Sequence, residues 1–276
     1  MRKITLLLAT VLISSIALNA QKKKDPKYEH HFKAPESIVT DEYSVEFSNI
    51  QSQAEFCKMA IKVSNNTNDF LIFEKGKSVF NFEFGEYSDK KKQIIIKPND
   101  SKKRVLTAVG SEKFQVEKFS LNVDGFSVVP VKGTVSEMED FQVPANTNSV
   151  SSDLFDVKLN PKKTSLKTQG SVLQFECTYK GNEVGLLDPS RIVIKVEGTE
   201  KEYANNDSKS EIRMMKKGDK IKFKTKFFIP GRIADMQFAN MIISWKDAFV
   251  ETKTKKLEGK KVNFEIDPGM TNGKNN

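Results

Sequence analysis

The chain has 276 residues, of which 38% are hydrophobic, and this length suits two domains of about 110 to 120 residues with cores of their own. Its formal net charge is +9, and most of its lysines alternate with apolar residues, as in 220–224, which places them on the solvent-facing side of a strand. Because nucleic-acid-binding proteins more often cluster their charge and favour arginine, this dispersed excess argues against nucleic-acid binding.

Residues 1–20 have the pattern of a signal peptide. A short basic start is followed by an apolar run from Ile4 to Leu18 and then by Asn19-Ala20-Gln21, which suits cleavage after Ala20. The apolar run is shorter than the roughly 20 residues that a membrane-spanning helix needs. We therefore predict a periplasmic or secreted protein with no membrane span after cleavage. An uncleaved anchoring helix is the alternative.

Residues 21–39 form a basic segment with prolines at positions 26 and 35, which we expect to be flexible and outside the folded modules. The segment holds the two histidines of the chain, His30 and His31. Adjacent side chains on an extended chain point in opposite directions. The sequence therefore predicts no metal site here.

Residues 40–133 alternate between apolar and polar side chains in short runs separated by turn residues, which is typical of a β-sandwich. We expect a first module here. Its predicted inward-facing positions are Tyr43, Val45, Phe47, Cys57, Met59, Ile61, Val63, Phe80, Phe82, Phe84, Val105, Thr107, Val109, Phe119, Leu121 and Val123.

Residues 134–152 are rich in Ser, Asn, Thr and acidic side chains and are predicted to be a linker. Alternation resumes over 153–266, which we expect to be a second module, and the Gly/Asn-rich residues 267–276 are expected to be a flexible tail. The predicted fold is therefore all-β, with two tandem immunoglobulin-like β-sandwich modules after a signal peptide.

The two halves resemble each other at offsets of about 119 to 123 residues, which indicates internal duplication. Asp124-Gly125-Phe126 in the first half matches Asp247-Ala248-Phe249 in the second. These residues either form two equivalent binding edges, with Asp124, Phe126, Asp247 and Phe249 as contact residues, or a repeated turn at the end of a strand. The sequence leaves both interpretations open.

The chain has two cysteines, Cys57 and Cys177, one in each predicted module. Each shares a strand face with apolar residues, so we expect both to be small core residues. An interdomain disulfide is the alternative, since an exported protein can form one, but both thiols would have to leave their cores to meet.

No motif for catalysis, a cofactor or a metal is present. The histidines lie outside both predicted modules, and there is no Gly-rich phosphate loop, no Gly-x-Ser-x-Gly elbow and no Cys-x-x-Cys pair. We therefore predict a non-enzymatic protein with no catalytic, cofactor-binding or metal-binding residues.

The run from Ala60 to Thr67, the aromatic-rich strand up to Phe84 and the turn at 96–98 resemble the immunoglobulin-like modules of bacterial secreted proteins, including the telokin-like class. The Lys-rich and Phe-rich composition and the cleavage region are similar to those of periplasmic proteins of Bacteroidota. Modules of this kind bind or space other molecules and have no shared site, so no residue role carries over.

The predicted function is an extracytoplasmic interaction or scaffold protein that binds a protein or a cell-envelope component through loops and edge strands. The alternative is a carbohydrate-binding module or an unrecognised glycan hydrolase in the same compartment. The exposure of Trp245 distinguishes these two functions. An exposed Trp245 would be the best platform for a sugar ring, and a buried one would not.

Overall fold

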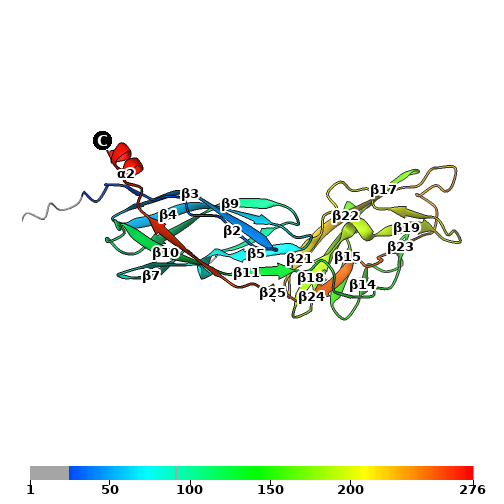
Figure 1. Ribbon diagram of the computed structural model, residues 1–276. Coiled ribbons are helices and arrows are strands. Elements are labelled where there is room, and N and C mark those ends of the chain that lie inside the picture. Colours follow the sequence, from blue (N-terminus) through cyan, green and yellow to red (C-terminus); the bar gives the residue numbers. More distant parts are fainter. Residues whose placement is uncertain (1–24, 91, 276) are drawn as a thin grey trace, which may run out of the picture.

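The computed structural model describes residues 25–275 except residue 91. The signal peptide expected at 1–20 lies outside these residues. The described chain is all-β, as predicted, and every strand pairing in it is antiparallel, with one short helix, α2 (Pro268–Asn275), near its C-terminal end. It forms two bodies that lie end to end, each around its own hydrophobic cluster (Figure 1).

Body 1 consists of the three sheets around the first cluster. In each, neighbouring strands are hydrogen-bonded. The first sheet contains β1 (His30–His31), β2 (Ile38–Val39), β3 (Tyr43–Gln53), β4 (Phe56–Asn65) and β9 (Ser101–Val109). The second has the order β26 (Lys260–Glu265), β10 (Lys118–Val123), β6 (Val79–Phe82), β7 (Gly85–Ser88). The third has the order β25 (Lys255–Lys256), β11 (Phe126–Val129), β5 (Phe70–Glu74), β8 (Gln93–Ile96).

Body 2 repeats this arrangement. Its first sheet contains β14 (Ser149–Ser151), β15 (Phe155–Leu159), β17 (Gly170–Tyr179), β16 (Ser165–Leu166) and β22 (Lys220–Phe228). The second has the order β13 (Phe141–Val143), β23 (Met241–Ser244), β19 (Val193–Val196), β20 (Glu202–Ala204). The third has the order β12 (Thr134–Val135), β24 (Phe249–Thr252), β18 (Val184–Leu187), β21 (Arg213–Met215). Three short 3-10 turns complete the list: η2 (Lys75–Lys77), η3 (Pro161–Lys163) and η4 (Pro189–Arg191).

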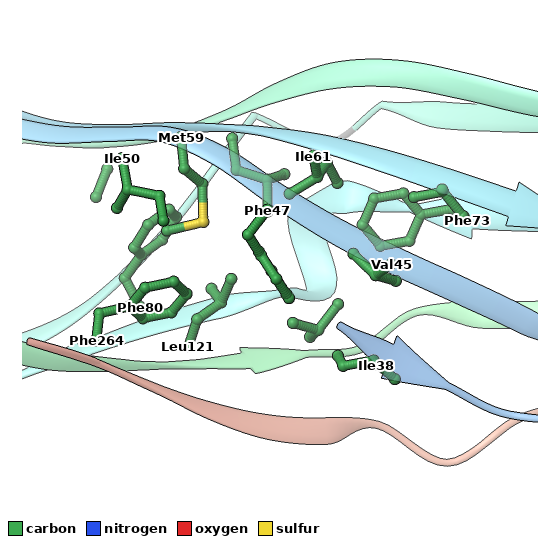
Figure 2. Packing of buried hydrophobic residues seen from close by; sticks show 14 of the residues in the cluster. Ile38, Val45, Phe47, Ile50, Met59, Ile61, Phe73, Phe80, Leu121 and Phe264 are labelled. Atoms are coloured by element: carbon green, nitrogen blue, oxygen red, sulfur yellow. The ribbon is translucent and has the colours of Figure 1, made fainter. Parts of the chain in front are cut away.

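The alternation in the sequence produces the two cores. Successive side chains of a strand point to opposite faces, and β4 and β17 alternate strictly between buried and partly exposed positions. Figure 2 shows side chains from several strands of body 1 packed together, among them Phe47, Phe80 and Phe264.

The predicted facing of β9 is wrong by one residue. Val105 and Val109, expected inside, are 51% and 56% exposed, whereas Leu106 and Ala108 are buried. Leu106 pairs with Met59 on β4, whose side chain points into the core, and this pairing decides the facing. Alternation alone could not decide it, because 105–109 carries apolar side chains on both faces.

The C-terminal part of the chain returns to body 1, which corrects the expected module boundaries. Residues 255–265 were assigned to the second module, yet β25 pairs with β11 and β26 pairs with β10. In Figure 1 this segment leaves body 2 and runs along body 1 to α2 at the far end. Phe264 from β26 is buried in the first cluster, stacked on Phe119 with ring centroids 4.7 Å apart.

The segment expected to be a linker, 134–152, contributes strands to body 2. Strand β12 pairs with β24, β13 pairs with β23, and β14 pairs with β15. Phe141 of β13 is buried against Phe175, with centroids 5.6 Å apart. The polar side chains that dominate this segment occupy its solvent-facing positions, and its few apolar side chains enter the core.

Each of these two segments follows the last core strand of one body and pairs with strands of the other body, so the two bodies exchange segments. After β11 the chain supplies β12 and β13 to body 2, and after β24 it supplies β25 and β26 to body 1. We call 134–143 and 255–265 the exchanged arms. Phe141 and Phe264 occupy the same relative place in the two arms, and their separation of 123 residues equals that of Phe126 and Phe249.

The two ends of the described chain are also packed, in contrast to the expected flexibility of 21–39 and 267–276. Strand β1 pairs with β3, and both of its histidines are buried. Phe32 lies edge-on to Phe119, with centroids 4.9 Å apart. Helix α2 docks beside β1, where Thr271 Oγ1 accepts a hydrogen bond from the His31 backbone N–H at 2.9 Å.

The two bodies meet through a third, smaller cluster of apolar side chains. It joins Phe70, Ile72 and Val129 of body 1 to Leu186 and Val250 of body 2, and all five are buried. In each body these residues belong to the sheet that also receives the short strand of an exchanged arm. The bodies are therefore joined both by buried surface and by chain exchange.

Cys57 and Cys177 are both buried and free, as predicted for core residues. Burial raises the pKa of the Cys57 thiol well above its ordinary value. Burial, with a smaller contribution from the charge of Asp156, raises the pKa of Cys177 to about 12. Both thiols are therefore protonated at neutral pH.

The arm exchange predicts that Phe264→Ala lowers the free energy of unfolding by about 3 to 5 kcal/mol, because it leaves a cavity in the first cluster. Denaturant unfolding of the purified protein measures this. Met270→Ala, at an exposed position of α2, is the control and should stay within about 0.5 kcal/mol of the parent. Equal, small effects of both substitutions would contradict the burial of Phe264.

The state of the cysteines predicts that neither thiol reacts with iodoacetamide in the native protein at neutral pH, because the reactive thiolate is scarce and inaccessible. Both should react once guanidinium has unfolded the chain. Mass spectrometry of the alkylated protein counts the labels. Rapid labelling of either cysteine in the native state would show that its strand opens readily.

Candidate functional site

The four residues predicted as possible contact residues lie in two separate turns, one in each body. Phe126 and Phe249 begin β11 and β24, and both are buried in their cores, so neither side chain can touch a partner. Asp124 and Asp247 are exposed in the turns just before these strands. The structure does not bring the four together.

Each turn has a structural role next to a 3-10 turn of its own body. The Gly125 carbonyl accepts a hydrogen bond from the Glu74 N–H at 2.9 Å, and the Ala248 carbonyl accepts one from the Asp188 N–H at 2.8 Å. Gly125 has φ of +96°, and a Cβ there would lie 2.6 Å from the Glu74 carbonyl oxygen. These contacts favour the repeated strand-end turn over a pair of binding edges.

The free edge of β9 in body 1 is protected by side chains. Asp89 Oδ2 accepts hydrogen bonds from the Thr107 N–H at 3.1 Å and from Lys75 Nζ at 2.7 Å. Lys75 Nζ also lies 3.4 Å from the Val105 carbonyl oxygen. The backbone groups that an added strand would use are therefore occupied in this stretch.

The edge of β22 in body 2 is protected in the same way. The Lys226 N–H donates to Asn205 Oδ1 at 2.8 Å, and the Lys226 carbonyl accepts from the Asn206 N–H at 2.8 Å. Asp207 lies beside them with its carboxylate 2.9 Å from Lys226 Nζ. Burial alone would raise the pKa of Asp207, but the hydrogen bond and charge of Lys226 outweigh it and the pKa is lowered.

Trp245 is buried in the second cluster. Its indole N–H donates to the Glu139 carbonyl at 2.8 Å, and its ring lies edge-on to Phe175 with centroids 5.4 Å apart. A tryptophan held in this way cannot stack on a sugar. The carbohydrate alternative therefore loses its best platform residue.

The most unusual surface feature is the loop 229–240, which joins β22 to β23. Two of its side chains are large, apolar and exposed: Phe238 at 81% and Ile233 at 47%. Phe228, which directly precedes the loop, is 52% exposed. We call these three residues the apolar tip.

The apolar tip lies at the end of body 2 away from body 1. Strand β22 begins just after a turn in which Lys216 Nζ donates a hydrogen bond to Gln93 Oε1 of body 1 at 2.7 Å. Since β22 runs away from that turn, its last residue and the loop after it lie at the distal end (Figure 1). The apolar tip is therefore remote from the contact between the bodies.

The loop is anchored although its apolar side chains are exposed. Met236 is buried, and its N–H donates to the Thr168 carbonyl at 3.0 Å, while the Ile229 N–H donates to the Gln169 carbonyl at 3.2 Å. The loop is thus packed on the turn 167–170 between β16 and β17. An anchored loop presents Phe238 in a defined position and not on a freely moving segment.

The surroundings of the apolar tip carry unpaired positive charge. Lys167 and Arg232 are exposed on the two packed turns. Among the described residues, neither has a carboxylate within ion-pair distance. The two packed turns therefore carry two unpaired basic side chains and one carboxylate, Asp235, beside the exposed Phe238.

Sequence reasoning missed the apolar tip. It predicted no binding residue in 229–240. The available signal was Phe238, an aromatic residue in a turn-rich segment where no alternating pattern assigns it to a core. Single exposed apolar residues are common, so this signal is weak on its own.

Comparison with known proteins adds no functional residue. No family model matches the chain, and no curated protein matches it. Among solved structures, the secreted serine protease VesC from Vibrio cholerae is similar over 79% of this chain, with a TM-score of 0.14 and 9% identity. The chain covers 48% of that protein, about half its length. A likeness of this size carries no argument about fold or chemistry.

Between residues 25 and 275, leaving out 91, no three His, Cys, Asp or Glu side chains are placed so that they could hold a metal ion. No helix in the same part of the chain is long and apolar enough to cross a membrane.

The burial of Trp245 predicts weak quenching of its fluorescence by acrylamide in the native protein and strong quenching after unfolding. Soluble envelope glycans should leave its emission unchanged, because the ring has no exposed face. Fluorescence titration measures both effects. A saturable shift in emission on adding a glycan would restore the carbohydrate alternative.

Proposed function

We propose that this is a non-enzymatic, extracytoplasmic interaction protein, built from two immunoglobulin-like bodies, that binds a protein partner through the apolar tip of body 2. The exposure of Phe238 on an anchored loop is the observation that carries this proposal. Large aromatic side chains are frequent binding hot spots, and here Phe238 is accompanied by exposed Ile233 in the same anchored loop and by exposed Phe228 directly before it.

The immunoglobulin-like assignment is supported by the repeated order of strand pairing in the two bodies and by the packing of sheets around each core. The extracytoplasmic assignment is supported by the signal-peptide pattern of residues 1–20. In this proposal the exchanged arms join the two bodies, and the apolar tip lies at the end of body 2 away from body 1.

A protein partner is favoured over a glycan. Trp245 is buried, and the apolar tip offers a phenylalanine and aliphatic groups, not the Trp and Tyr platforms that bind sugars. The unpaired Lys167 and Arg232 favour a partner whose surface is acidic around an apolar pocket. The protected edges of β9 and β22 favour loop contact over strand addition.

The proposal predicts that Phe238→Asp abolishes capture of the partner from an envelope extract while the free energy of unfolding stays within about 0.5 kcal/mol of the parent, because the side chain is exposed. Immobilised parent and variant proteins are compared by quantitative mass spectrometry of what they retain.

Val39→Asp is the matched control, because Val39 is also an exposed apolar residue but lies on body 1. It should retain the same proteins as the parent. Equal retention by all three proteins would show that the apolar tip does not bind the partner.

A further inference from the structure

A cleft lies where the two bodies meet, on the side of η2 and the start of β8. Its volume is about 420 Å³, and it is lined by Glu74, Gly76, Lys77, Lys92, Gln93 and Lys216. The first five belong to body 1 and Lys216 to body 2. This volume falls within the range of about 300 to 1,000 Å³ found for small-molecule sites.

The cleft has an excess of positive charge. Its described lining contains three lysines and one carboxylate, and that carboxylate, Glu74, pairs with Lys77 at 3.0 Å. Lys216 Nζ is held by the neutral amide oxygen of Gln93 at 2.7 Å. Among the described residues, neither Lys216 nor Lys92 has a carboxylate within ion-pair distance.

The neighbouring lysines behave differently. Lys75, next to the cleft, pairs with Asp89 at 2.7 Å, and Lys97, which also spans the two bodies, pairs with Glu211 at 2.7 Å. Of these lysines, Lys75 and Lys97 thus have acidic partners, whereas Lys92 and Lys216 in the cleft do not. A concave wall lined by one sign of charge concentrates counter-ions more than a flat surface does.

We propose that this cleft binds a small polyanion that carries phosphate or sulfate groups. Lys92 and Lys216 would approach the anionic oxygens as point charges from the two bodies. Lys77 and the Gln93 amide N–H₂ would donate the further hydrogen bonds that such groups accept. Gly76 leaves the wall of η2 free of a side chain at this place. The proposal is independent of the apolar tip, which lies at the other end of body 2.

A ligand in this cleft would contact both bodies at once. It would therefore add to the apolar cluster that joins them, and it would stabilise the folded chain by an amount that grows with the logarithm of its concentration above the dissociation constant. Dependence on Lys92 and Lys216 distinguishes a site in the cleft from loose attraction of anions to the basic surface, which would not depend on two particular lysines.

The test uses two probes, pyrophosphate and a sulfated disaccharide, titrated into the purified protein by isothermal calorimetry at low and at moderate salt. We expect saturable binding of one or both probes, which weakens as salt is added. Binding of pyrophosphate alone identifies a phosphorylated ligand, and binding of the disaccharide alone identifies a sulfated glycan.

The double variant Lys92→Ala/Lys216→Ala should weaken binding at least about 10-fold, since it removes both unpaired charges from the wall of the cleft. Lys162→Ala/Lys163→Ala, in the exposed η3 turn of body 2, removes the same charge elsewhere and should leave binding unchanged. Absence of saturable binding of either probe, or equal weakening by both double variants, would overturn the proposal.

Discussion

Consecutive backbone pairs from Lys118↔Glu265 to Val123↔Lys260 join β26 to β10, and the equivalent contact joins β13 to β23. Each core is therefore closed by a strand that follows the last core strand of the other body: β13 comes after β11, and β26 comes after β24. Without its arm, a body would lose a buried phenylalanine and expose the hydrogen-bonding edge of a central strand. Because both arms also lie in the sheets that form the contact between the bodies, the two cores and their interface depend on one another.

The sequence was sufficient for the strands and the cores, since strict alternation identifies which side chains of β4 and β17 face inward. It was not sufficient for the partners of those strands. Alternation describes the faces of a strand but not its edges, so it could not show that 255–265 lies beside β10 and not in body 2. The shared spacing of Phe141 and Phe264 with Phe126 and Phe249 was the available clue. It matches the arms to each other, but it still does not say which body each arm enters.

The binding surfaces were harder to predict than the fold, for a related reason. The repeated Asp-x-Phe turns match between the halves, but Phe126 and Phe249 match because both cores need them. The surfaces that remain open are not repeated. The loop between β9 and β10 that corresponds to 229–240 has its phenylalanine, Phe114, buried, whereas Phe238 is 81% exposed. The lysines of the cleft come from segments far apart in the chain. Features that differ between two copies of a module are therefore the better guide to what each copy binds.

The exchange of arms also determines the order in which the two bodies can complete their folds as the chain is synthesised. A polypeptide is made from its N-terminus, so most of body 1 is synthesised first, but its closing strand, β26, is made only after all the strands of body 2. Body 2 has its own arm, 134–143, in place before its remaining strands are made. The half that is synthesised second can thus complete its fold first, and body 1 keeps an open edge until residues 255–265 have been made.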